Sequence, residues 1–256
     1  MTLLTVKDML RMTLLSGLLF IGVFSPLTSA DVGTSNVTKI TLLPSQITLS
    51  YSDAVRFSQV LSDAYAQLNY DVYTLGTTLI NPHKQSVVDA QKHTILRQLK
   101  RLNTPEAVNL ANQLSALRFA FHEPMVTDPV KVRIQAKLNP MVRGEYWLSL
   151  PKRPSDISVF HPAQGNYLSL PVNSGDHLKD YLTKLDGTIE WDGDYDSAWI
   201  IQADRKVYHV KDIQWKSTLY FLSPGAMVFV GLHNLPDEYR DLNADIAHLL
   251  AFRLEL

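Results

Sequence analysis

The densest group of side chains that could do chemistry is the acidic stretch Glu190-Trp191-Asp192-Gly193-Asp194-Tyr195-Asp196. Its three aspartates alternate like positions 1, 3 and 5 of a calcium-binding loop. Such a loop also needs glycine at position 6 and glutamate at position 12, where this sequence has Ser197 and Ala203. We therefore expect no metal here and interpret the stretch as a solvated polar loop. A weak calcium site and a pair of glycosidase carboxylates remain the alternatives.

Other motifs of catalysis and cofactor binding are absent from the sequence. There is no cysteine, no GxSxG, no HExxH and no glycine-rich phosphate loop, and the eight histidines have no ligand spacing. We expect no catalytic residue and no cofactor. The formal net charge is −1 with acids and bases interspersed, so the basic stripe of a nucleic-acid-binding protein is also missing.

Two tryptophans are candidate binding residues. Trp191 stands among the acids, and Trp215 stands in a polar sequence between predicted strands. An indole face can stack on a sugar ring or anchor a protein interface. Trp199 lies in an apolar run, which favours a place in the core.

Three arginines form a second candidate group. Arg133 and Arg143 precede the stiff link Pro151-Lys152-Arg153-Pro154, and Arg153 lies on it. A guanidinium fork at this junction could hold an acidic sugar or a carboxylate of a partner protein. Surface arginines are common, so a purely solvated role is the alternative.

The elements that must position these residues follow one pattern twice, at 47–64 and 167–185. Each segment is predicted to be a short strand, a polar turn and a helix with apolar residues at i, i+3, i+4 and i+7. Ser and Asp residues in both turns, Ser52-Asp53 and Ser174 with Asp176, suit N-caps. The apolar sets are Phe57, Val60, Leu61, Ala64 and Leu178, Tyr181, Leu182, Leu185. The repeat predicts two small related units rather than one large catalytic domain.

Residues 84–119 interrupt this pattern and predict a helical hairpin inserted in the first unit. Ile95, Leu99 and Leu102 share one helical face. The sequence Asn103-Thr104-Pro105-Glu106 then starts a second helix, with Thr104 as N-cap and Pro105 at N1. A short connection between two helices favours an antiparallel pair.

Further strands are predicted from alternating or apolar runs, and a helix closes the chain. The strands are 39–43, 132–138, 145–150, 198–202, 207–210, 219–222 and 227–230. After Pro236, a stripe of Tyr239, Leu242, Ile246, Leu249 and Leu250 predicts an amphipathic helix. We expect this helix to pack on its own domain, with docking on a partner or membrane as the alternative.

The first thirty residues have the features of a secretory signal peptide. Lys7 and Arg11 precede the apolar run 12–24, and Thr28-Ser29-Ala30 provides small residues for cleavage before Asp31. The run is shorter than the ~20 residues that span a bilayer. We therefore expect cleavage after Ala30, a periplasmic product and no transmembrane segment after cleavage.

Several segments resemble the GfcC-type family of group 4 capsule and exopolysaccharide biosynthesis. They are Leu150–Pro154 with Asp156–Val159, Ser223–Gly231, and Leu235-Pro236 with Leu242–Ile246 and Leu249–Arg253. In addition, Gly175–Asp180 resembles the turn and helix start of SLBB-type β-grasp modules. The resemblance implies an α+β fold with two β-grasp (ubiquitin-like, SLBB-like) domains, at 31–151 and 152–233. The hairpin at about 84–119 would be inserted in the first, and 234–256 would be the C-terminal helix.

The resemblance also implies a function. It is that of a non-enzymatic periplasmic accessory protein in capsule or exopolysaccharide assembly and export. The implied partners are capsular polysaccharide or outer-membrane polysaccharide export proteins, and no catalytic residue comes with the family pattern. One rival is a periplasmic polysaccharide-modifying enzyme, which a cleft with paired carboxylates would favour. The other is a purely structural partner of an outer-membrane export channel.

Overall fold

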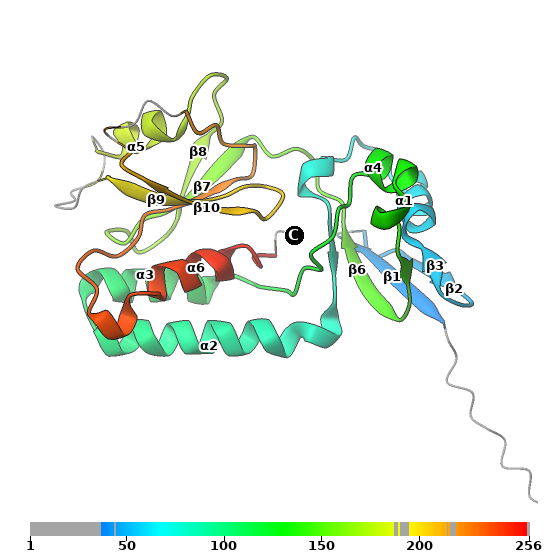
Figure 1. Cartoon of the computed structure of the whole chain (residues 1–256), viewed down its shortest axis with the longest axis horizontal. Helices are drawn as coiled ribbons and strands as arrows, with labels where there is room; N and C mark the ends of the chain where they lie inside the picture. Colours follow the sequence, from blue (N-terminus) through cyan, green and yellow to red (C-terminus); the bar gives the residue numbers. More distant parts are fainter. Residues whose placement is uncertain are drawn as a thin grey trace, which may run out of the picture. The chain divides into compact units, whose positions relative to one another are not determined.

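Two β-sheets organise the protein in the computed structural model, which describes residues 37–254 apart from 44, 187–188, 190–194, 214 and 216–218 (Figure 1). The expected signal peptide, Trp191, Asp192 and Asp194 lie outside the described residues. The first sheet has the order β2-β1-β6-β4. Its strands are β1 (Thr38–Leu43), β2 (Thr48–Tyr51), β4 (Thr78–Ile80) and β6 (Glu145–Ser149).

Helix α1 (Phe57–Ala66) covers one face of the first sheet and buries the four apolar residues of the predicted stripe. The helix begins later than the Ser52-Asp53 signal suggests, and its N-cap is Arg56, without a side-chain cap. The reason is a short strand, β3 (Val55–Arg56), which pairs with β5 (Met141–Val142) before the helix can start. The predicted Ser/Asp cap is therefore wrong here.

The second sheet repeats the connections of the first. It has the order β10-β9-β11-β7-β8, and α5 (Leu178–Asp186) follows β8. In both sheets the first two strands are antiparallel, a helix follows, and a later strand pairs parallel to the first one. The strands are β7 (Asp156–Phe160), β8 (Leu168–Pro171), β9 (Ser197–Ile201), β10 (Val207–Lys211) and β11 (Met227–Phe229). The predicted repeat is thus present in a mixed α/β fold.

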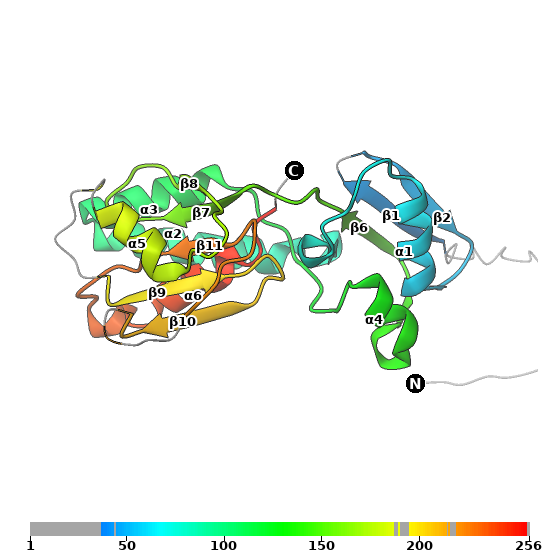
Figure 2. The ribbon, with the colours of Figure 1, turned by 90° about the horizontal axis from the view of Figure 1, so that it is seen from above.

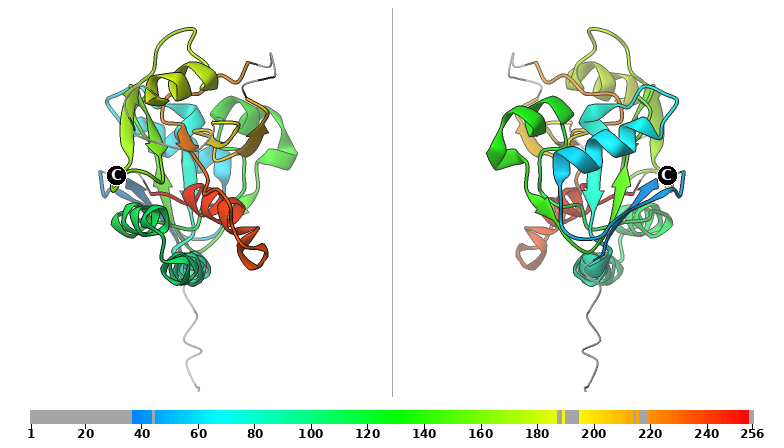
Figure 3. Two further views of the ribbon diagram at one scale, coloured as in Figure 1. Left: turned by 90° about the vertical axis from the view of Figure 1, so that its left-hand side faces the viewer. Right: turned by 90° about the vertical axis from the view of Figure 1, so that its right-hand side faces the viewer.

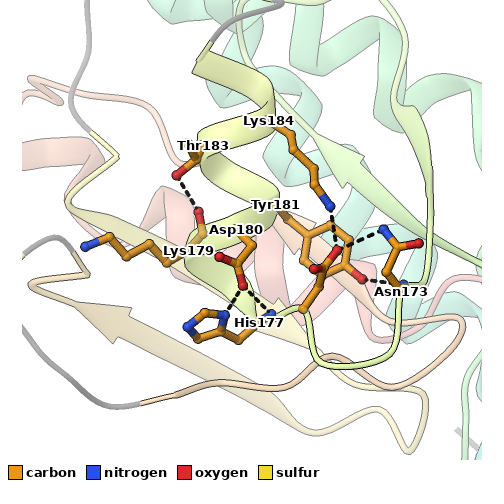
Figure 4. Close-up of polar contacts among 8 residues, drawn as sticks. Asn173, His177, Lys179, Asp180, Tyr181, Thr183 and Lys184 are labelled. Atoms are coloured by element: carbon orange, nitrogen blue, oxygen red, sulfur yellow. Dashed lines mark hydrogen bonds and ion pairs between the residues drawn. The ribbon is translucent and has the colours of Figure 1, made fainter.

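Local hydrogen bonds fix the start of α5 (Figure 4). The carboxylate of Asp180 accepts the backbone N–H of His177 at 3.0 Å, which is one half of a capping box, and it also contacts the His177 ring. Asp176 accepts the side-chain amide of Asn173 at 2.9 Å and pairs with Lys184. His177, rather than Ser174 or Asp176, directly precedes α5, so these contacts hold the turn in place of the predicted Ser/Asp cap.

The helical hairpin packs on the second sheet. Helices α2 (Gln85–Leu102) and α3 (Pro105–Ala116) lie with α6 (Leu242–Leu250) on one face, and α5 lies on the other (Figures 1 to 3). Leu99, Leu110 and Ile246 are fully or almost fully buried in one cluster with Phe160 and Phe229 of that sheet. The hairpin is inserted between strands of the first sheet in sequence, yet its apolar face belongs to the core beneath the second.

The ends of these helices follow the expected cap chemistry. Thr104 accepts the N–H of Ala107 at 3.2 Å with Pro105 at N1, and α2 ends at Asn103 in the left-handed conformation. The C-terminal helix starts later than expected, because Pro236 opens a short 3₁₀ turn (Asp237–Tyr239) before α6.

Two predicted strands are absent. The run 132–138 forms the end of α4 (Pro129–Ile134) and a 3₁₀ turn (Ala136–Leu138). Asp128 caps α4 by accepting the N–H groups of Val130 and Lys131, so the cap overrides the β-branched composition. In 219–222, Phe221 makes an isolated bridge with His177, and the described residues of that run form no strand.

Candidate functional site

A polar groove with an aromatic wall lies at one end of the second sheet, and we call it the Trp199 groove. Its volume of about 330 Å³ falls within the range of small-molecule sites. It is lined by Ser197, Trp199, His209, Gly231, Leu232, His233, Arg240, Asp241, Asn243 and Ala244. Strands β9 and β10, the segment after β11 and the start of α6 each contribute residues. The fold therefore brings the site together from four separate parts of the sequence.

The aromatic wall is a pair of stacked rings. Trp199 and His209 are opposite each other across β9 and β10, with ring centroids 4.0 Å apart and planes 3° from parallel. On the same face of β9, Ile201 is completely buried beneath the helices, whereas Trp199 is only partly buried. The expectation that Trp199 lies in the core is therefore only half right, because the helical cover ends at this edge of the sheet.

The opposite wall is rigid. The Asn243 side chain accepts the N–H of Leu232 and donates to its carbonyl, both at 2.9 Å. Gly231 lies directly beneath this amide, since a Cβ on Gly231 would meet Asn243 Nδ2 at 2.7 Å. A glycine is needed here for close approach rather than for backbone freedom.

The charges of the groove are few and lie at its rim. Arg240 and Asp241 are well exposed, with Nε and Oδ2 3.6 Å apart, which makes their ion pair weak. Burial, and then the charge of Lys211, lowers the pKa of His209, so this ring is neutral at pH 7. Neutral aromatic rings, amide groups and one guanidinium can stack against a sugar and hydrogen-bond to its hydroxyl or carboxylate groups.

Of the two tryptophans predicted to bind, Trp215 is 87% exposed and does not line this groove, and Trp191 lies outside the described residues. Instead, two other tryptophans line grooves in the structure: Trp199 lines this groove, and Trp147 on β6 lines another. The sequence had suggested no binding role for either residue. A signal for Trp147 exists, because alternation in Glu145–Ser149 puts it on the face opposite Tyr146 and Leu148.

The three candidate arginines do not gather. Arg143 precedes β6 and pairs with Asp53 at 3.0 Å, whereas Arg153 follows the strand. Strand residues rise ~3.3 Å each, so the length of β6 separates these two side chains. Arg133 is exposed on α4.

Arg153 lies beside a narrow crevice. Its guanidinium carbon is 5.7 Å from the centroid of the Tyr73 ring, and Tyr73 lines the crevice with Pro154 and Arg205. The crevice has a volume of about 20 Å³, which is room for one water molecule. A sugar therefore does not fit inside it, although the exposed Arg153 remains accessible to a partner.

Among the described residues, no histidine, aspartate and glutamate side chains gather in threes in a way that could hold a metal ion. None of the described helices combines the length and apolar character needed to cross a membrane.

The fold and groove define a mixed α/β protein with two sheets of the same connection and an aromatic, polar site at the edge of the second. Comparison with family models shows the family of this protein. Residues 34–153 match the model "Capsule biosynthesis GfcC, N-terminal", and residues 166–255 match "Capsule biosynthesis GfcC C-terminal". The chain belongs to the GfcC capsule biosynthesis family.

One curated relative is the uncharacterized protein YjbG of Escherichia coli (strain K12). It is 27% identical over 158 residues, which cover 58% of this chain. The match spans 60% of the length of YjbG.

Proposed function

We propose that this protein is a non-enzymatic accessory factor of capsule or exopolysaccharide assembly and export that holds saccharide in the Trp199 groove. The observation that carries the proposal is the stacked pair of Trp199 and His209 at the wall of a 330 Å³ polar groove, in a member of a capsule biosynthesis family. An aromatic face beside hydrogen-bonding groups suits a pyranose ring, which has apolar faces and polar edges.

The composition of the groove favours binding over hydrolysis. Glycoside hydrolysis uses two carboxylates on either side of the scissile bond. Asp241 is the one carboxylate among the described residues that line the groove, and it already faces Arg240. The rival of a polysaccharide-modifying enzyme is therefore less well supported.

The shared connection of the two sheets supports the finer fold assignment. A hairpin, a helix and a strand parallel to the first are the features expected of a β-grasp unit, and the second sheet would be the SLBB-like one. The proposed site of action is the periplasm, after removal of residues 1–30, as the signal-peptide pattern indicates.

Binding of purified protein to capsular polysaccharide from the producing strain tests the proposal. Titration calorimetry should show binding by the wild type and a loss of at least tenfold in Trp199→Ala. Tyr208→Ala is the control, because Tyr208 is an exposed aromatic ring on β10 that does not line the groove. Equal loss in both variants, or no binding by the wild type, would contradict the proposal. Capture of an outer-membrane export protein without any affinity for sugar would favour the structural rival.

A further inference from the structure

A second groove lies on the outer face of the first sheet, and we call it the Trp147 groove. Its volume is about 420 Å³, and it is separate from the Trp199 groove in every lining residue. It is lined by Pro82, Gln85, Asp89, Lys92, Leu117, Arg118, Phe119, Ala120, Trp147 and Leu254. The start of α2, the segment after α3, strand β6 and the C-terminal segment meet here.

Trp147 is held on a rigid surface. It stands in the middle of β6, paired with Thr41 of β1 on one side and Ile80 of β4 on the other. Its neighbours Tyr146 and Leu148 point into the core beneath α1, so the Trp147 side chain faces outward and is 36% exposed. A large apolar ring kept accessible on a central strand gives a planar surface for stacking.

Two cations lie in the same groove. Lys92 donates to the carbonyl oxygen of Leu117 at 2.9 Å and lies 5.0 Å from the centroid of the Phe119 ring, which fixes the position of its ammonium group. Arg118 is exposed, and its side chain makes no ion pair or hydrogen bond with the described part of the chain. Its guanidinium fork is therefore available to a carboxylate.

Asp89, the acidic residue among those described around the groove, already accepts a hydrogen bond, and the net charge of the described lining residues is positive. Asp89 accepts a hydrogen bond from Gln85 Nε2 at 2.9 Å, and the same nitrogen donates to the Phe119 carbonyl at 3.0 Å. Among the described residues that line the groove, one carboxylate thus faces two cations, Lys92 and Arg118. This charge favours an acidic ligand, and the indole favours a ring.

We propose that the Trp147 groove is a second saccharide site, which binds a sugar residue bearing a carboxylate, with the ring on Trp147 and the carboxylate on Arg118. The inference rests on the proposed function and adds to it the acidic character of the ligand. Two sites on one chain suit a polymer, because the second contact is made at a high effective concentration.

The test uses the full mature chain and an oligomer of galacturonic acid, with its methyl ester as the uncharged counterpart. Calorimetry should show that Trp147→Ala and Arg118→Gln each weaken binding of the acid at least tenfold. The ester should bind the wild type and Arg118→Gln equally. Arg97→Gln is the matched control, since Arg97 is exposed on α2 and does not line the groove. Arg118→Gln keeps the experiment informative even if Trp147→Ala is poorly folded, because the Arg118 side chain is exposed.

Three results would overturn the inference. They are no binding of the acid by the wild type, equal affinity for acid and ester, or unchanged binding in both groove variants. If native polysaccharide still binds and Trp199→Ala still abolishes that binding, only the second site is wrong. If native polysaccharide does not bind at all, the proposed function fails as well.

Discussion

The Nε2 atom of His122 lies 3.3 Å from the carbonyl oxygen of Phe252, which is 130 residues further along the chain. Its other nitrogen, Nδ1, lies 2.9 Å from the hydroxyl of Thr78 on β4. A neutral ring satisfies both contacts, with Nε2–H donating to the carbonyl and the hydroxyl donating to Nδ1. His122 thereby joins the first sheet, the segment after the hairpin and the C-terminal segment.

Acid is expected to destabilise the protein through its buried histidines. Burial lowers the pKa of His122 to about 3 and that of His161 to about 4. Between these values and the ordinary pKa of ~6.5, the unfolded chain binds protons that the folded chain does not. The free energy of unfolding should therefore be highest above pH 6.5 and fall as the pH drops from 6.5 towards 4.

The variant His122→Gln isolates one of these two groups. Between pH 6 and 5, the slope of the unfolding free energy with pH should fall by about 1.2 kcal/mol per pH unit, because the unfolded histidine binds about nine-tenths of a proton over this range. Urea titrations at several pH values measure it. His93→Gln, at an exposed position on α2, should keep the wild-type slope. An unchanged slope in His122→Gln would show that His122 is not the titrating group.

Truncating a buried leucine of the hairpin tests its place beneath the second sheet. Leu99 is fully buried there, so Leu99→Ala should cost about 2–5 kcal/mol of unfolding free energy. Val87 is on the same helix and 55% exposed, so Val87→Ala should stay within ~0.5 kcal/mol of the wild type. Chemical denaturation measures both. A cost for Leu99→Ala no larger than that for Val87→Ala would contradict the packing.

Adding one methyl group should deform the Trp199 groove. In Gly231→Ala the new Cβ would meet Asn243 Nδ2 at 2.7 Å, and the two hydrogen bonds of Asn243 leave it little freedom to move. We expect a destabilisation of ~1–3 kcal/mol and weaker saccharide binding. Gly165→Ala should change neither, because nothing lies within 4 Å of its added Cβ. Full affinity in Gly231→Ala would show that this wall does not contact the ligand.

The exposed arginine of the link is expected to act on function rather than stability. Arg153→Ala removes a guanidinium that stacks on Tyr73 and can reach an acidic sugar or partner. Surface polysaccharide should fall, while the melting temperature changes little, since exposed substitutions usually cost less than ~0.5 kcal/mol. Arg97→Ala is the control. Normal capsule with a stable Arg153→Ala protein would show that Arg153 has no role in capsule secretion.

Local interactions explain why parts of the structure follow from the sequence. Helix α3 starts where Thr104 and Pro105 predict, and both repeat helices bury their predicted stripes, because caps and periodicity depend on neighbouring residues. The strand predicted at 132–138 is wrong for a related reason. Its β-branched residues favour a strand only where they can pack in a sheet. Here the N-cap from Asp128 outweighs that preference, and the segment begins as a helix.

The family itself could be inferred from short motifs in order, and the family models support that inference. The two grooves could not be inferred from the sequence, because each joins residues that are distant along the chain. The Trp199 groove joins Trp199 on β9 with Arg240 near α6, and the Trp147 groove joins β6 with Arg118, which follows α3.

What the sequence determined by itself is the repeated strand–turn–helix pattern, the helical hairpin and the C-terminal helix, with the apolar face of each helix. Which surface each face covers was decided only by tertiary packing. The face of α2 that carries Leu99 is complementary to both α6 and the second sheet, and no local pattern encodes that choice. The hydrophobic effect that drives this packing is non-directional, so the same apolar stripe could have covered the first sheet. The candidate sites lie on surfaces that this packing leaves partly uncovered, at Trp199 and Trp147.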